Sequence, residues 1–263
     1  MKLSGAHVLV TGASRGIGAC VAEGAARRGA TVSLVARSAD ALAERAQELG
    51  GHALPCDLGD QAQRADLVAR AESAAGRPVD VLVSCAGVDQ VSGVLELSAE
   101  QLRQVYEVNL LAPTELLRQL VPGMVTRGRG HLVTVSSGFS TVIGPGFVPY
   151  ASSKAGLSHF HAALRLELRG TGVGMTLVEP GPVQTAMYAD IEQHRLASAV
   201  MRRFLRLHLT RVVGPRDVAE PILDAIEHDR AHVVPVRRMT PVLAFDWLPR
   251  RVSELVLTGV PRR

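Results

Sequence analysis

Short runs of β-branched and other apolar residues alternate with amphipathic stretches along most of the chain. In the amphipathic stretches, apolar residues recur every three or four positions, which is typical of helices with one buried face. The short runs have the length and composition of strands. We predict strands at residues 7–10, 31–35, 52–55, 79–84, 131–136, 173–178 and 232–234. We predict helices at residues 19–28, 39–49, 61–74, 113–127, 150–169 and 215–228.

This alternation predicts an α/β protein, because repeated strand–helix–strand units build a parallel sheet with helices on both faces. The connections are short and no Pro/Gly/Ser-rich linker divides the sequence. We therefore expect residues 1–263 to form one domain, a doubly wound Rossmann fold with a seven-stranded parallel sheet. Residues 186–210 interrupt the alternation after the sixth strand, with apolar and charged residues mixed. A lid over a ligand is expected there, with a pair of surface helices as the alternative.

The composition limits which classes of protein remain. Hydrophobic residues make up 47% of the chain and aromatic residues 3%, so the core must consist mainly of Ala, Val and Leu. Cys20, Cys56 and Cys85 are too few and too scattered for a disulfide framework or a metal cluster. We expect them to be small buried side chains in a reducing compartment. The sequence shows neither a secretory leader nor an apolar run of membrane-spanning length, so a cytoplasmic protein is expected.

Positive charge is concentrated in the last quarter of the chain, where residues 195–263 contain 13 arginines and seven acidic residues. Stacking aromatic residues are not interleaved with these arginines, so nucleic-acid binding is not expected. The tail at residues 240–263 combines the single Trp with apolar residues and arginines. Packing on its own subunit and peripheral contact with a membrane are both consistent with that pattern.

A glycine-rich turn follows the first predicted strand, where residues 11–18 read TGASRGIG and a helix begins. Gly12, Gly16 and Gly18 have no Cβ, so backbone amides and the helix N-terminus can approach a pyrophosphate closely. A turn of this kind directly after the first strand is a strong indication of a dinucleotide site.

The end of the second predicted strand indicates which dinucleotide binds. An acidic residue there would bind the ribose 2′-hydroxyl of NAD, but this strand is followed by Arg37. Arg15 in the glycine-rich turn supplies a second guanidinium. Two arginines can hold a 2′-phosphate through charge-assisted hydrogen bonds, so NADP(H) is favoured over NAD(H). The alternative is that Arg37 is only a surface residue at the end of a strand.

A Tyr–Lys pair is the candidate for chemistry. The chain has only two lysines, and Lys154 follows Tyr150 by four residues, which places both on one face of a helix. A phenol has a pKa near 10, too high for efficient proton exchange near neutrality. A neighbouring ammonium should lower that pKa. Tyr150 can then donate a proton to a carbonyl oxygen while a nicotinamide supplies hydride.

With these motifs, the sequence resembles the short-chain dehydrogenase/reductase family over nearly its whole length. The family's motifs occur in order: TGASRGIG at 11–18, Asp57, CAG at 85–87, Asn109, Ser136 and Ser137, YASSK at 150–154, and PGPVQT at 180–185. The resemblance implies a catalytic set of Asn109, Ser137, Tyr150 and Lys154. It implies that Ser137 hydrogen-bonds the reacting oxygen, Lys154 also holds the nicotinamide ribose, and Asn109 keeps a water in a proton relay.

The same resemblance implies the cofactor contacts. Asp57 matches the residue that contacts the adenine, and the family tripeptide Asn-Ala-Gly is here Cys85-Ala86-Gly87. A thiol cannot make the hydrogen bonds of an amide, so Cys85 is either a buried filler or a reactive thiol. Thr185 can also be the N-cap of a helix. The expected cofactor contacts are Gly12, Ser14, Arg15, Gly16, Ile17, Gly18, Arg37, Asp57, Leu58, Cys85, Ala86, Gly87, Asn109, Tyr150, Lys154, Pro180, Gly181, Val183 and Thr185.

The positions expected to face the substrate are mostly apolar, which predicts a lipophilic ketone or its alcohol, such as a steroid, a polyketide or a 3-oxoacyl compound. The expected activity is NADP(H)-dependent, reversible reduction of a ketone to a secondary alcohol. The alternatives are a non-catalytic dinucleotide-sensing protein and an NAD-linked alcohol dehydrogenase of the same family. Family members pair through the helices at 109–127 and 150–169, so a homodimer or homotetramer is expected. The expected substrate contacts are Ser137, Gly138, Phe139, Phe147, Tyr150, Gln184 and Met187.

Overall fold

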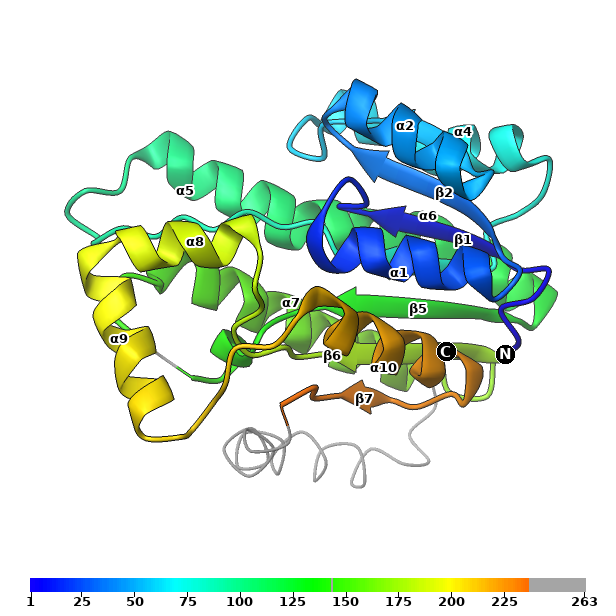
Figure 1. Cartoon of the computed structure of the whole chain (residues 1–263). Coiled ribbons are helices and arrows are strands. Elements are labelled where there is room, and N and C mark those ends of the chain that lie inside the picture. Colours follow the sequence, from blue (N-terminus) through cyan, green and yellow to red (C-terminus); the bar gives the residue numbers. More distant parts are fainter. Residues whose placement is uncertain (143, 237–263) are drawn as a thin grey trace.

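The computed structural model of the protein describes residues 1–142 and 144–236. Seven strands form one sheet in which every paired neighbour runs parallel, in the order β3-β2-β1-β4-β5-β6-β7. This confirms the predicted α/β fold and its seven-stranded parallel sheet (Figure 1). The strands are β1 (His7–Thr11), β2 (Thr31–Ala36), β3 (His52–Pro55), β4 (Val81–Ser84), β5 (Gly130–Val135), β6 (Val173–Val178) and β7 (His232–Val233).

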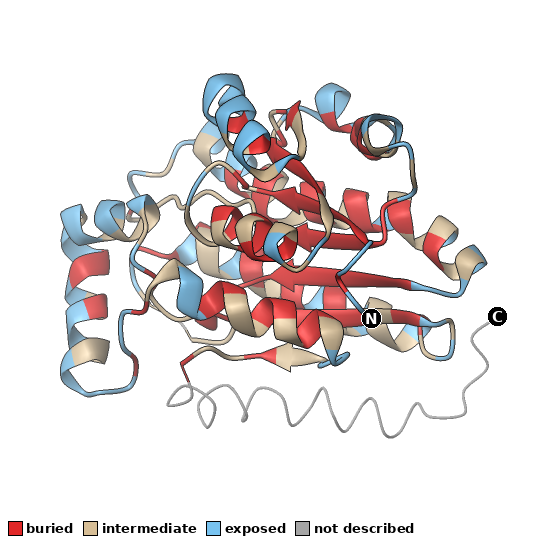
Figure 2. Cartoon of the chain, turned by 45° about the vertical axis from the view of Figure 1, so that its right-hand side comes forward, coloured by how far each residue is buried: buried red, intermediate tan, exposed pale blue. Residues whose placement is uncertain are grey.

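Two apolar clusters fix the helices on opposite faces of the sheet. One face is covered by α1 (Gly16–Arg27), α2 (Ala39–Leu49) and α10 (Pro215–Glu227), whose buried Val, Ala, Leu and Ile side chains form a single cluster with the strands. The other face is covered by α4 (Leu67–Ala75), α6 (Ala112–Arg127) and α7 (Val148–Glu167). Figure 2 shows the sheet as an almost continuous buried layer between them.

The strand order reverses between β1 and β4, because β1 pairs with β2 on one side and with β4 on the other. In open α/β sheets, ligands bind at such a reversal, beyond the carboxyl ends of the strands. Two further helices, α8 (Ala186–Gln193) and α9 (Arg195–Arg206), stand at that end of the sheet (Figure 1). A bridge between Val183 and Val213 closes the base of this α8–α9 segment, with the Gln184 amide donating to the Val213 carbonyl over 2.9 Å.

One helix was missed by the sequence analysis. Residues Ala99–Tyr106 form α5, which continues through one π-helical turn, η1 (Glu107–Leu111), into α6. A capping box begins α5: the Gln101 amide donates to the Ser98 hydroxyl, and the Gln101 side chain accepts from the Ser98 amide. The predicted helix at 61–74 is also divided, into α3 (Gln61–Arg64) and α4, because Asp66 begins a new helix.

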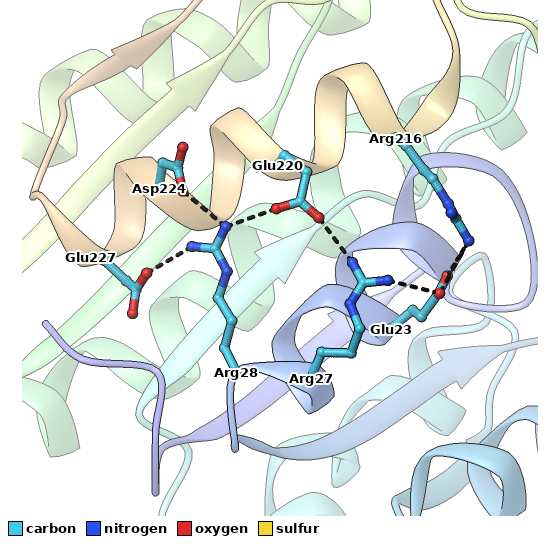
Figure 3. Close-up of polar contacts among 7 residues, drawn as sticks. All are labelled: Glu23, Arg27, Arg28, Arg216, Glu220, Asp224 and Glu227. Atoms are coloured by element: carbon cyan, nitrogen blue, oxygen red, sulfur yellow. Dashed lines mark hydrogen bonds and ion pairs between the residues drawn. The ribbon is translucent and has the colours of Figure 1, made fainter.

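Charged side chains join α1 to α10 along their exposed sides (Figure 3). Arg28 contacts Glu220, Asp224 and Glu227 at 2.7–2.8 Å. Arg27 bridges Glu23 and Glu220 at 2.9–3.0 Å. This network fastens the helix that follows the glycine-rich turn to the last helix before β7.

Neither a membrane-spanning helix nor a metal site is found among the described residues. Across residues 1–142 and 144–236, no helix has the length and apolar character needed to cross a membrane. The same residues contain no group of His, Cys, Asp or Glu arranged to hold a metal ion. The tail at 240–263, with its predicted packing or membrane contact, lies outside the described residues.

Candidate functional site

A cavity of about 780 Å³ lies at the carboxyl ends of the strands. It extends from the glycine-rich turn to the inner sides of α8 and α9. All the expected cofactor and substrate contacts line it except Asn109. The sequence-predicted residues on its wall are Gly12, Ser14, Arg15, Gly16, Ile17, Gly18, Arg37, Asp57, Leu58, Cys85, Ala86, Gly87, Ser137, Gly138, Phe139, Phe147, Tyr150, Lys154, Pro180, Gly181, Val183, Gln184, Thr185 and Met187.

The glycine-rich turn between β1 and α1 is shaped by close backbone contacts. Gly12 has a φ of +69°, and a Cβ there would lie 2.9 Å from the Cα of Ala86. A Cβ on Gly18 would lie 2.4 Å from the carbonyl oxygen of Gly12. No other residue type fits either position without moving the backbone. The turn therefore leaves the first backbone amides of α1 facing the cavity, which suits the pyrophosphate of a dinucleotide.

Two guanidinium groups stand at the rim beyond this turn. Arg15 and Arg37 both line the cavity and are both exposed. Asp57 lies beside them after β3, where its carboxylate accepts a 2.9 Å hydrogen bond from the Gly59 amide. The rim thus offers positive charge at the end of β2, where a ribose 2′-phosphate would lie, and the residues present fit NADP(H).

The loop after β4 is held by Thr11 at the end of β1. The Thr11 hydroxyl accepts hydrogen bonds of 3.1 Å from the amides of both Cys85 and Ala86. Cys85 is half-buried on the cavity wall, and burial raises the pKa of its thiol to about 12. The thiol is therefore neutral near pH 7, which supports the prediction of a filler over that of a reactive thiol.

Tyr150 and Lys154 lie on the same face of α7 and both line the cavity. The Lys154 Nζ donates a 3.0 Å hydrogen bond to the carbonyl of Val135, the last residue of β5. Burial lowers the pKa of Lys154 to about 8. The Tyr150 phenol forms a hydrogen bond with Ser137, which directly follows Ser136 at the end of β5. The structure thus brings Ser137, Tyr150 and Lys154 together on one wall.

The pKa of Tyr150 differs from the sequence-based expectation. Burial raises it to about 12, and the hydrogen bond with Ser137 lowers it by less than burial raises it. The negative charge of Asp89 raises it further. Lys154 was expected to lower this pKa, but the hydrogen bond with Ser137 is what lowers it, and desolvation of the phenolate outweighs that bond. The protein groups around Tyr150 therefore keep the phenol protonated.

Asn109 lies in the π-helical turn η1 and is fully buried behind the cavity wall. Its Nδ2 donates to the Val88 carbonyl over 2.8 Å, and its Oδ1 accepts from the Val88 amide over 2.9 Å. Nδ2 also lies 3.2 Å from the Ser153 hydroxyl on α7. π-helical turns occur often at functional sites, and this one aims an amide at the loop after β4. Asn109 therefore fixes the backbone of that loop relative to α7.

A buried polar chain supports the loop that carries Ser137. The Ser140 hydroxyl donates a 2.5 Å hydrogen bond to Glu179, and Glu179 contacts the His232 Nε2 at 2.7 Å. The Gly138 amide donates to the Pro180 carbonyl over 2.9 Å. These contacts tie the ends of β5 and β6 together. They were not foreseen from sequence, because nothing local marks Glu179 as a partner of Ser140.

The substrate end of the cavity has apolar walls and one acidic group. Phe139 and Phe147 stack with ring centroids 4.2 Å apart, and Met187, Ile191, Met201 and Phe204 from α8 and α9 complete the wall. Thr185 occupies the N-cap position of α8, but its hydroxyl donates to the Val183 carbonyl instead of capping the helix. Asp89 also lines the cavity, and no sequence motif pointed to it.

Comparison with known proteins identifies the family. The sequence profile described as "short chain dehydrogenase" matches residues 6–196. The ketoacyl reductase HetN of Nostoc sp. is 35% identical over 88% of this chain and 79% of its own. The 3-ketodihydrosphingosine reductase of Bos taurus is 30% identical over 86% of this chain and 70% of its own. Glycine betaine reductase ATRR of Emericella nidulans is 36% identical over 85% of this chain, but the match covers only 18% of that longer protein.

Solved structures agree with these sequence relatives. A short-chain dehydrogenase from Streptomyces avermitilis superposes with a TM-score of 0.78 at 28% identity, covering 99% of this chain and 100% of its own. A metagenomic short-chain oxidoreductase in complex with NADP gives a TM-score of 0.71 at 30% identity, covering 89% of this chain and 98% of its own. The chain belongs to the short-chain dehydrogenase family of oxidoreductases, whose members bind nicotinamide dinucleotides.

Proposed function

We propose that the protein is an NADPH-dependent carbonyl reductase that converts a lipophilic ketone to a secondary alcohol. The observation that carries this proposal is the arrangement of Ser137, Tyr150 and Lys154 on one wall of a cavity whose far end bears Arg15 and Arg37. Proton donor and phosphate-binding groups thus share one enclosed space.

Each residue has a distinct task in this proposal. A bound NADPH supplies hydride to the carbonyl carbon. Ser137 donates a hydrogen bond that positions the carbonyl oxygen, and Tyr150 donates the proton to that oxygen. Burial keeps Tyr150 protonated near neutral pH, so it holds the proton that this step requires, although the raised pKa makes that proton harder to release. Lys154, one turn further along α7, would bind a ribose hydroxyl of the cofactor and would stabilise negative charge developing on the phenol oxygen.

The cofactor preference follows from the rim of the cavity. Arg15 and Arg37 would hold the 2′-phosphate of NADPH, and the backbone amides at Gly12–Gly18 would hold the pyrophosphate. The relative solved with NADP supports a 2′-phosphorylated dinucleotide. Asp57 would contact the adenine ring.

The proposed substrate class rests on the apolar wall of the cavity, and the proposed assembly rests on exposed apolar residues of η1 and α7. The stacked Phe139 and Phe147 with the apolar residues of α8 and α9 favour an aliphatic or polycyclic ketone, and relatives named as a ketoacyl reductase and a 3-ketodihydrosphingosine reductase support an acyl-type ketone. Leu111 on η1 and Phe160 on α7 expose 47% and 39% of their surface, which supports pairing of subunits through these helices.

A ketone screen tests the proposed function. Purified protein is mixed with NADPH or NADH and a panel of aliphatic, acyl and polycyclic ketones, and loss of the reduced-nicotinamide absorbance is followed. We expect turnover with at least one lipophilic ketone and a higher kcat/KM with NADPH than with NADH. NADPH binding without turnover across the panel would instead support the dinucleotide-sensing alternative.

A further inference from the structure

Asp89, an acidic residue at the substrate end of the cavity, has one carboxylate oxygen without a hydrogen-bond partner among the described residues. Asp89 follows Val88, whose backbone is clamped by Asn109 through two hydrogen bonds. Among the described residues, no group forms a hydrogen bond with the buried Oδ2 of Asp89. The carboxylate does accept a hydrogen bond from its own backbone amide. Oδ2 is thus desolvated and unpaired but has almost no accessible surface, and other atoms of the half-buried Asp89 form part of the cavity wall.

Charged groups on both sides of Asp89 act on the pKa of its carboxyl. Burial raises the pKa of Asp89 to about 6, and the negative charge of Asp190 on α8 raises it further, whereas the positive charge of Arg15 lowers it. The carboxyl is therefore mainly ionised at pH 7. Asp89 in turn raises the pKa of Tyr150, which means that the two groups act on each other across the cavity. Arg15 is exposed and makes no direct hydrogen bond to Asp89 within the part of the chain described.

A buried carboxylate oxygen without a donor is costly, because it has lost water and gained nothing in exchange. A turn about the Cβ–Cγ bond would bring this oxygen to the cavity, where a ligand that supplies a donor removes that cost, and a cationic donor also neutralises the charge. The walls nearby are apolar and include Val142, Ile191 and Met201. The complementary ligand therefore combines a positively charged donor with an apolar chain.

We propose that Asp89 binds a protonated amino group of the substrate, so that the preferred substrates are lipophilic amino ketones. The amino group would lie close to the reacting carbonyl, because Asp89 and Tyr150 line the same end of the cavity. This proposal rests on the carbonyl reductase function proposed above. It names a substrate class that the apolar walls alone do not indicate.

The test compares two ketones of the same shape. Dimethylaminomethyl hexyl ketone carries an amine next to the carbonyl, and isobutyl hexyl ketone replaces its nitrogen by a CH group. We expect the amino ketone to have the higher kcat/KM at pH 7 with NADPH. In Asp89→Asn the ratio of the two kcat/KM values should fall at least tenfold. The control Asp190→Asn also removes a negative charge near Asp89 but should change the ratio less than twofold. An unchanged ratio in Asp89→Asn overturns the proposal.

A binding measurement separates this proposal from the proposed function. Calorimetric titration of hexylammonium and of 1-hexanol into the protein saturated with NADPH requires no turnover. We expect hexylammonium to bind more tightly than hexanol, and this preference to be lost in Asp89→Asn. If neither ketone is reduced but the Asp89-dependent preference persists, the amine site stands and the reductase function fails. If hexylammonium binds no better than hexanol, the amine site fails.

Discussion

At the scale of single residues, the site depends on a phenol whose pKa is raised rather than lowered. The sequence indicated that Lys154 would act directly on the pKa of Tyr150, but the larger effect is burial. Tyr150 therefore carries its proton near pH 7, and the proposed reduction requires the phenol to release that proton to the carbonyl oxygen despite the raised pKa. The ammonium of Lys154 is anchored on the Val135 carbonyl and is itself partly desolvated.

Replacing Tyr150 by Phe removes the proposed proton donor but keeps the ring. We expect kcat for ketone reduction to fall by about 10²–10⁴-fold, the usual contribution of general acid catalysis, with NADPH affinity retained. Tyr106→Phe is the control, because the Tyr106 hydroxyl contacts Ser152 at 2.7 Å and does not line the cavity. Steady-state kinetics and NADPH titration measure both effects. Wild-type kcat in Tyr150→Phe would contradict the assigned role.

Replacing Arg37 by Asp tests the proposed cofactor preference. The new carboxylate would repel a 2′-phosphate and accept hydrogen bonds from a ribose 2′-hydroxyl, so the ratio of kcat/KM for NADPH to that for NADH should fall at least about tenfold. Arg230→Asp makes the same charge change at an exposed position just before the amino end of β7, outside the cavity lining. It should leave the ratio as it is in the wild type. A retained NADPH preference in Arg37→Asp refutes the role of Arg37.

At the scale of elements, the sequence predicted the strands well, because the central strands β1, β4, β5 and β6 are short runs rich in aliphatic residues and buried on both faces. It missed α5, in which Leu102 and Val105 are the only aliphatic residues with long side chains. The capping box at Ser98 and Gln101 was the available signal. The π-helical turn that aims Asn109 at Val88 has no comparable signature, since it depends on how α5 and α6 pack. The sequence analysis did not identify Asp89, because only the folded structure shows that its Oδ2 has no hydrogen-bond partner among the described residues.

His131 on β5 makes the pairing of β5 with β6 sensitive to acid. Its ring is buried against the Thr176 hydroxyl at 2.8 Å, and burial lowers its pKa to about 4. The unfolded chain therefore binds a proton near pH 6.5 that the folded chain takes up only near pH 4, so stability is lost as the pH falls through this window. His131 should contribute about 2 kcal/mol to the loss of unfolding free energy between pH 7 and pH 5.

Urea denaturation at pH 7 and pH 5 measures this contribution. His131→Gln should be less stable than the wild type at pH 7 but lose less stability on acidification. His159→Gln, at an exposed position on α7, should keep the pH slope of the wild type. Equal slopes in His131→Gln and the wild type would show that the ring is protonated in the folded state.

At the scale of the whole molecule, α1 and α10 come from opposite ends of the described chain and are joined by apolar packing and by the charge network of Figure 3. Because α1 begins with the glycine-rich turn, this junction supports the position of the cofactor cradle. Sequence patterns predicted both helices. They could not predict that Arg28 would meet three carboxylates on α10, since the pairing depends on the register between helices.

Arg28 and Arg27 offer a matched comparison of this network. Arg28→Met should lower the unfolding free energy by about 1–2 kcal/mol, because its side chain is only 24% exposed and its loss removes the ion pairs of Asp224 and Glu227, while Glu220 keeps its ion pair with Arg27. Arg27→Met should cost less than about 0.5 kcal/mol, because that side chain is 53% exposed and solvent screens its ion pairs. Urea denaturation at low and high salt measures both. Equal costs for the two variants would show that burial does not strengthen the network.

Neither apolar cluster contains a residue of the α8–α9 segment, although both surround the sheet from which it projects. The segment is joined to that sheet at its base by the Val183–Val213 bridge. Selection, natural or in the laboratory, can therefore diversify Met187, Ile191, Met201 and Phe204 almost independently of folding. Libraries restricted to these four positions should yield mostly well-folded variants that differ in the ketones they accept.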